Sequence, residues 1–181
     1  MSEFLNEDQK RYLLGLAREA VTSRVQTGRT IEAGTKDPVL LAKRGVFVTL
    51  KVKGELRGCI GHPLPHKPLA EAVAEMAIAA ATQDYRFEPL VESDLPNLDI
   101  EISVLTLPRS VKDVHEVAVG KHGIIVSKGP YKGLLLPQVP LEYDWDLETF
   151  LRHGCLKAGL AENEWKKGVT IEVFEAQVFS E

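Results

Sequence analysis

Cys59 is the residue of this sequence best suited to covalent chemistry. It lies in the hexapeptide LRGCIG, residues 56–61, where we expect Gly58 and Gly61 to leave the backbone accessible on both sides of it. Alternation along a strand predicts that Arg57 shares the face of Cys59, and a nearby guanidinium favours the thiolate, which is the reactive form. The competing interpretation is a small buried apolar residue, the usual state of a free cysteine.

Further polar candidates lie in segments that we predict to be loops or turns. Asp84 and Arg86 flank Tyr85. They either bind a polar group of a ligand or form an ion pair that ties the loop to the preceding helix, and the sequence leaves both interpretations open. His122 precedes a predicted strand, and Glu142 belongs to an acidic run around Trp145.

Metal and cofactor chemistry has little support in this sequence. Cys59 and His62 have Cys-x-x-His spacing, and His153 and Cys155 add two further donor types, but a single spacing of this kind is a weak zinc signal. Cys155 falls at helical spacing with Leu151, so we expect it in the core. No phosphate-binding glycine loop, dinucleotide fingerprint or serine-hydrolase elbow occurs. We therefore expect no metal and no cofactor.

The composition is that of an ordinary soluble domain. The chain has 181 residues, of which 44% are hydrophobic and 27% charged, with a formal net charge of −4. That balance disfavours a nucleic-acid binder, although Lys43, Arg44, Lys51 and Lys53 could form a local basic patch. We expect a cytoplasmic protein, because no membrane-length apolar run, signal-peptide pattern or disulfide framework occurs.

Helix and hairpin patterns are mixed along the chain, which predicts an α+β fold with antiparallel sheets. Asn6 and Gln9 form a capping-box pattern at the start of a first helix, and Asp146 and Gly159 mark the two ends of a late one. Between and after them we expect an alanine-rich helix, three hairpins or strands, and an imperfectly alternating last strand: residues 69–83, 46–61, 98–108, 123–139 and 169–179.

The hexapeptide LRGCIG resembles a motif of the AMMECR domain family, whose prokaryotic members include the AmmeMemoRadiSam system protein A type. Other blocks resemble that family in the same order: DYRFEPL (84–90), EISVLT (101–106), KHGI (121–124), LLLPQV (134–139) followed by Glu142 and Trp145, and CLKAGL (155–160). The resemblance covers nearly the whole chain. One departure is His62, where many relatives carry threonine, and it weakens the metal interpretation further.

The resemblance implies a single AMMECR-type domain over residues 1–181, with two unequal subdomains, a cleft between them, and the larger subdomain built from both chain ends. From the two hairpins we expect a smaller subdomain of residues 40–66 and 112–140, and a larger one of 1–39, 67–111 and 141–181. The family has no established biochemical activity. Its prokaryotic members are often encoded beside a Memo-like protein and a radical SAM protein, which implies these two as partners.

Two functions remain open on this basis. The first is an accessory component that binds a ligand or a partner protein. The second is an enzyme with Cys59 as nucleophile or covalent carrier in a cleft, acting on an anionic metabolite or a peptide. The candidate ligand-binding residues are Arg57, Gly58, Gly61, Asp84, Arg86, His122 and Glu142. Because bare backbone groups and guanidinium forks pair well with carboxylates, we expect an anionic ligand.

Overall fold

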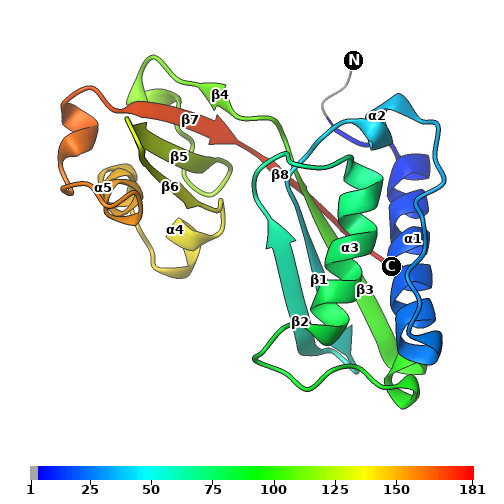
Figure 1. Cartoon of the computed structure of the whole chain (residues 1–181). Helices are drawn as coiled ribbons and strands as arrows, with labels where there is room; N and C mark the ends of the chain where they lie inside the picture. The colour runs from blue at the N-terminus through cyan, green and yellow to red at the C-terminus, as the bar shows by residue number, and fades with distance from the viewer. Residues whose placement is uncertain (1–3) are drawn as a thin grey trace. The chain divides into compact units, whose positions relative to one another are not determined.

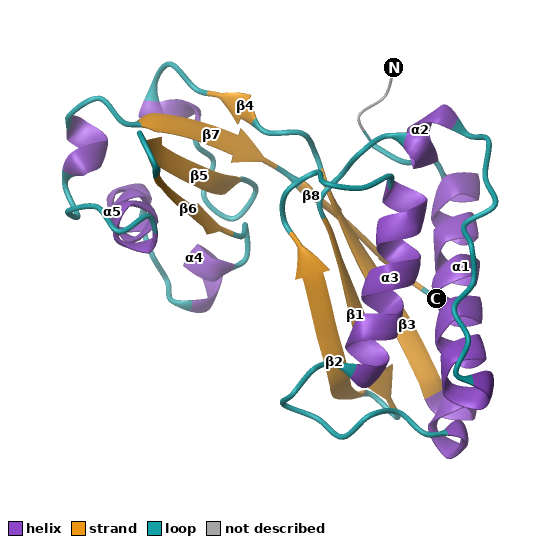
Figure 2. Cartoon of the chain, in the orientation of Figure 1, coloured by secondary structure: helices purple, strands orange, loops and turns teal. Residues whose placement is uncertain are grey.

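Two four-stranded sheets and the helices packed on them make up the computed structural model, which describes residues 4–181 (Figures 1 and 2). The α+β class predicted from the sequence is confirmed. The chain divides into two compact units: unit 1 takes the described residues up to Leu105 together with Gln177–Glu181, and unit 2 takes Thr106–Ala176. Within the described residues, no helix is both long and apolar enough to cross a membrane.

Unit 1 is a sheet covered on one face by helices. Its elements are α1 (Glu7–Thr27), α2 (Pro38–Leu41), β1 (Val46–Val52), β2 (Glu55–His62), α3 (Leu69–Thr82), a 3-10 turn η1 (Glu92–Asn97), β3 (Leu98–Leu105) and β8 (Ala176–Ser180). The strand order is β2-β1-β3-β8, so that β2 is an edge strand, and β1 pairs antiparallel with both of its neighbours. Alternate residues of β1, from Val46 to Val52, are buried beneath the helices.

The two long helices of unit 1 follow from local sequence. The Asn6 side chain accepts a hydrogen bond from the backbone N–H of Gln9, and the Gln9 side chain accepts one from the backbone N–H of Asn6. These two bonds confirm the predicted capping box. Seven of the eleven buried residues of helix α3 are alanines. These short side chains let the helix approach the sheet closely, and most of its residues are buried.

Unit 2 is smaller and consists of the second sheet and the helices that accompany it. Its elements are β4 (Arg109–Ser110), η2 (Val114–Glu116), β5 (Gly123–Lys128), β6 (Tyr131–Leu135), α4 (Val139–Glu142), α5 (Leu147–Lys157), η3 (Glu164–Lys166) and β7 (Thr170–Phe174), and its strand order is β4-β7-β5-β6. Asp146 caps α5 by accepting from the Thr149 backbone. Gly159 adopts the left-handed conformation, with φ of 78°. Both helix ends predicted from the sequence are therefore confirmed.

Two expectations about the chain's organisation are wrong. The hairpins do not build one subdomain together, because β1 and β2 pair with β3 in unit 1 whereas β5 pairs with β7 in unit 2. The single last strand expected over residues 169–179 is in fact two strands, β7 and β8. The irregular alternation near Phe174 marks the point where the chain leaves one sheet as β7 and enters the other as β8.

Candidate functional site

The loop after α3 is fastened to the backbone of β2 by Asp84 and Arg86. The Asp84 carboxylate accepts from the backbone N–H of Cys59 at 2.9 Å, and Arg86 Nη2 donates to the Cys59 carbonyl at 3.3 Å. The two side chains also bind each other, through Nε to Oδ1 at 2.9 Å and Nη2 to Oδ2 at 2.7 Å. We call this arrangement the Asp84–Arg86 clasp. It occupies the outward backbone groups of an edge strand, as a neighbouring strand would.

The Asp84–Arg86 clasp strongly favours the ionised form of Asp84. The Asp84 side chain is 2% exposed, whereas that of Arg86 is 48% exposed. Arg86 holds the pKa of the Asp84 carboxyl far below its usual range, and the Cys59 N–H contributes to the same shift, against the opposing effect of burial. Asp84 and Arg86 therefore form the ion pair that was one of the two interpretations of the sequence. The expectation of accessible backbone around Cys59 is wrong at Cys59 itself.

Arg57 does not share the face of Cys59 in the simple way that alternation predicts. The β1–β2 register pairs Leu50 with Gly58 but Lys51 with Leu56, so Arg57 is an extra residue in β2. Such a bulge breaks the alternation of faces. The Arg57 guanidinium reaches the carboxylate of Asp94 in η1, at 3.3 and 3.4 Å. This internal ion pair, rather than a ligand, neutralises Arg57.

The two glycines of the hexapeptide serve close packing. A Cβ on Gly58 would lie 2.0 Å from the Ala80 carbonyl oxygen, so glycine is what allows α3 to approach β2 here. A Cβ on Gly61 would lie 2.5 Å from the Phe47 ring and 2.3 Å from the Val46 carbonyl oxygen. Gly58 is buried and Gly61 half-buried, so neither presents bare backbone in the manner expected of a ligand cradle.

The Cys59 thiol is half-buried, and its contact is a hydroxyl. Thr49 Oγ1 donates to Cys59 Sγ at 3.2 Å. A nucleophilic cysteine is usually paired with a general base, and a threonine hydroxyl cannot act as one at neutral pH. Within residues 4–181, no three His, Cys, Asp or Glu side chains are grouped so that they could hold a metal ion. Cys155 is fully buried in α5, as expected, and burial raises the pKa of its thiol.

Tyr85 is the residue that sequence reasoning passed over. It lies between the two clasp residues and is 96% exposed. The loop that carries it is fixed on both sides, since the Arg86 backbone N–H donates to Asp84 and the Phe87 N–H donates to the Asp84 carbonyl. An aromatic residue between oppositely charged neighbours in a short loop was the available signal.

The remaining candidates, His122 and Glu142, belong to unit 2. His122 is buried, and its Nδ1 accepts from the Ala118 N–H at 3.0 Å. Burial lowers the pKa of His122, although Glu175, 3.7 Å from Nε2, raises it. Glu142 ends α4 and is exposed. His122 is therefore a packed residue with a backbone partner, whereas the exposed Glu142 side chain has no hydrogen bond or ion pair with any other described residue.

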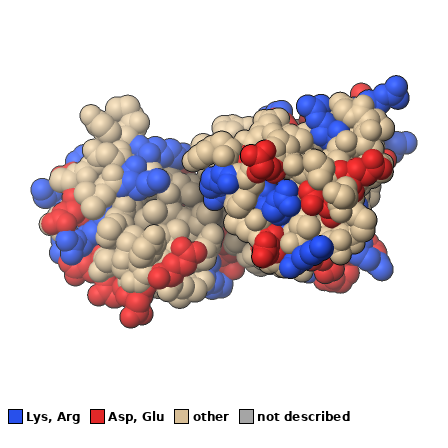
Figure 3. All heavy atoms as spheres, turned by 90° about the horizontal axis from the view of Figure 1, so that it is seen from below, with Lys and Arg blue, Asp and Glu red and all other residues tan. Residues whose placement is uncertain are grey.

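The basic patch considered for nucleic acid does not form as a free surface. Arg44 is buried and donates to the Leu105 carbonyl, and Lys51 lies 3.4 Å from Glu101. Figure 3 shows Lys and Arg side chains interspersed with Asp and Glu on the face of each unit that it displays. This interspersed charge gives a nucleic acid no continuous basic stripe to follow there.

Comparison with known proteins agrees with the resemblance carried by the motifs. The chain is 48% identical to Protein MK0488 of Methanopyrus kandleri, over 100% of this chain and 92% of that protein, and 45% identical to Protein MJ0810 of Methanocaldococcus jannaschii, over 90% and 85%. It is similar to the crystal structure of the uncharacterized protein PH0010 from Pyrococcus horikoshii, with a TM-score of 0.78, 41% identity, and coverage of 98% of this chain and 93% of that one. The AMMECR1 family model matches residues 14–179, which include the hexapeptide, the clasp and both sheets, and the chain belongs to the AMMECR1 family.

Proposed function

We propose that this protein is a cytoplasmic accessory component that binds partner proteins, and that it acts with Memo-like and radical SAM proteins. The observation that carries the proposal is the display of Tyr85, which is 96% exposed on a loop anchored by the Asp84–Arg86 clasp. Tyrosine is enriched among the residues that dominate interface energies, and a side chain held this far out of the fold offers nearly its whole surface for a partner to cover.

The clasp makes Tyr85 a favourable anchor because it lowers the entropic cost of binding. A loop that is already ordered loses little freedom when a partner covers it, so more of the contact energy remains as affinity. Arg86 adds a polar group to the same loop: its Nε and Nη2 are used in the clasp and its guanidinium lies 5.3 Å from the centroid of the Phe87 ring, while its side chain is still 48% exposed. An exposed tyrosine and a half-exposed arginine in one short loop are a composition typical of interface hot spots.

The alternative, an enzyme with Cys59 as nucleophile acting on an anionic substrate, has less support. Both guanidiniums that would attract an anion are paired internally, Arg57 with Asp94 and Arg86 with Asp84. The hydroxyl of Thr49 is the hydrogen-bond partner of the thiol, and it is not a base. The same residues therefore support a structural role for LRGCIG, which holds the loop of Tyr85 in place.

Association with the two partners tests the proposal. The chain would be co-expressed with the Memo-like and radical SAM proteins of the same genome, and the affinity for each purified partner measured by biolayer interferometry. We expect Tyr85→Ala to weaken binding to at least one partner by about 30-fold, the effect of losing a hot spot worth about 2 kcal/mol. Cys59→Ala should bind as the wild type does.

Tyr131→Ala is the matched control, because Tyr131 is a 52% exposed tyrosine in the hairpin of unit 2. It should leave the affinity unchanged. Equal binding by wild type and Tyr85→Ala, or no association with either partner, would contradict the proposal. A loss of binding in Cys59→Ala, with the fold intact by circular dichroism, would instead return the function to the thiol.

A further inference from the structure

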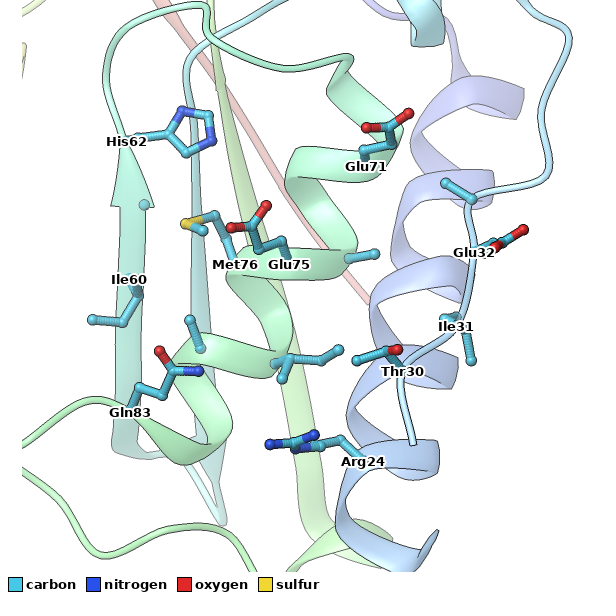
Figure 4. A pocket seen from close by; sticks show the side chains of 15 residues that line it. Arg24, Thr30, Ile31, Glu32, Ile60, His62, Glu71, Glu75, Met76 and Gln83 are labelled. Atoms are coloured by element: carbon cyan, nitrogen blue, oxygen red, sulfur yellow. The ribbon is translucent and has the colours of Figure 1, made fainter. Parts of the chain in front are cut away.

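A cavity of about 810 Å³ lies in unit 1 on the outer side of α3 (Figure 4). One wall is the segment that follows α1, including Thr30–Ala33, and the other is the end of β2, including Ile60–His62. Its volume falls within the range of small-molecule sites, about 300–1,000 Å³. Cys59 and the clasp residues do not line it, so it is separate from the site described above.

The floor of the cavity is apolar and made of short side chains. Ala74, Ile78 and Ala79 of α3 line it, and each is less than a tenth exposed. Two alanines at these positions leave a hollow that longer side chains would fill. Met76 lines the side towards β2 and Ile31 the side towards the opposite segment. An apolar body of a ligand would bury these groups from water and gain hydrophobic free energy.

The rim carries more negative than positive charge. Three carboxylates, those of Glu32, Glu71 and Glu75, line the cavity with one guanidinium, that of Arg24. Glu75 is paired with Lys67, while Glu32 and Glu71 have no hydrogen bond or ion pair with any described residue. The uncompensated charge of the rim therefore favours a cation.

His62 adds an unused hydrogen-bonding atom. Its Nδ1 lies 3.1 Å from the Leu64 carbonyl oxygen, a contact that needs a proton on Nδ1 and leaves Nε2 of the neutral ring as an acceptor. Nε2 is shielded from solvent and has no hydrogen-bond partner among residues 4–181. The ring is turned towards α3 (Figure 4). A buried acceptor without a donor costs free energy, which a donor supplied by a ligand would recover once a movement of the ring exposed Nε2 to the cavity.

We propose that this cavity binds a small organic cation: an apolar body, aromatic or aliphatic, that carries a protonated amine or another cationic N–H donor. The apolar body lies over the α3 floor and the charge meets the carboxylates of Glu71 and Glu32. His62 forms part of the wall, and its Nε2 accepts from the ligand once the ring moves to expose that atom. The proposal goes beyond the partner-binding function and does not depend on Tyr85, which lies outside the cavity lining.

Three indole compounds of matched size test the charge preference: cationic tryptamine, neutral tryptophol and anionic indole-3-acetate. Each would be titrated into the ¹⁵N-labelled full chain near neutral pH, with dissociation constants taken from amide chemical shifts. We expect tryptamine to shift the amides of residues 30–33, 60–62 and 71–79 and to bind more tightly than the other two. Binding of tryptophol or indole-3-acetate as tight as that of tryptamine, or shifts confined to other segments, would overturn the proposal.

Variants of the full chain locate the contacts. Glu71→Gln should weaken tryptamine binding by about fivefold, the Coulomb energy of one exposed charge pair at contact distance. Glu19→Gln is the matched control, an exposed glutamate of α1 outside the cavity, and should change nothing. Ala74→Leu should fill the hollow and abolish binding while the amide spectrum stays that of a folded protein. Equal affinity in wild type, Glu71→Gln and Ala74→Leu would show that tryptamine binds elsewhere.

Discussion

The Asp84–Arg86 clasp makes a quantitative prediction about the stability of β2. In Asp84→Asn one carboxylate oxygen becomes an NH₂ group, which cannot accept a hydrogen bond and meets a donor instead. If Oδ2 is replaced, the bonds from Cys59 N at 2.9 Å and Arg86 Nη2 at 2.7 Å are lost. An unpaired backbone N–H costs about 1–3 kcal/mol, and the half-exposed arginine contributes below about 1 kcal/mol. We expect a loss of about 2 kcal/mol.

Hydrogen exchange at the Cys59 amide is the suitable measurement, because a chain with two compact units need not unfold in one step. A local loss of about 2 kcal/mol corresponds to exchange about 30-fold faster in Asp84→Asn. Asp8→Asn is the control: Asp8 also pairs with an arginine, Arg11, but the two side chains are 85% and 76% exposed. This surface pair should leave the exchange of Cys59 unchanged.

The pH dependence of stability distinguishes the effect of the Asp84 charge from the effect of the changed side-chain shape. Because the pKa of Asp84 is depressed in the folded protein, its contribution to stability is complete above the unfolded value of about 3.9 and is lost as the pH falls towards the folded value. The asparagine variant has no such titration. The difference in stability between the two proteins should therefore narrow below about pH 4. A difference that stays constant down to about pH 3, or exchange no faster than in Asp8→Asn, would refute this account of the clasp.

Two further predictions concern one glycine and one histidine. Gly58→Ala should lower the free energy of unfolding by about 1–3 kcal/mol, because its Cβ would meet Ala80. The control Gly34→Ala lies in open space and should not lower it. Urea unfolding followed by circular dichroism measures both variants, and equal midpoints would contradict the packing argument. Because burial lowers the pKa of His122, unit 2 should lose stability as the pH falls below about 6.5, where the unfolded chain binds the proton more readily than the folded one. Both tryptophans lie in unit 2, so their fluorescence reports its unfolding. His122→Gln should remove this dependence of stability on pH.

Local sequence signals predicted the fold well wherever contacts between residues close in the sequence determine it. The capping box at Asn6, the cap at Asp146 and the left-handed Gly159 are set by contacts within a few residues, and the structure confirms all three. Alternate residues of β1 are likewise buried, as expected of a strand that packs one face against helices. What failed was pairing over long distances. The imperfect alternation near residue 175 indicates an irregular strand, but it does not indicate that the strands on its two sides join different sheets.

The candidate site shows the same division. Asp84, Arg86 and Cys59 were singled out separately, but the clasp that joins them spans about 25 residues and depends on β2 being an edge strand, which no local pattern reveals. Arg57 was misplaced because a single bulge reverses the alternation, and the glycine beside it was the only hint. The cavity over α3 was not predicted, because it arises from what the alanines leave unfilled.

Strand β8 has a consequence for how the protein is made. It lies beside β3, and Glu181, the residue after it, is bonded to Arg18 of α1, yet the chain reaches β8 only after unit 2. During synthesis, unit 2 is contiguous and folds as it emerges, whereas β3 waits with an unpaired edge. The speed of translation through residues 106–176 therefore sets how long the nascent chain exposes that edge to aggregation. We therefore expect the yield of folded protein to depend on the codons that encode unit 2, although the exposed edge belongs to unit 1.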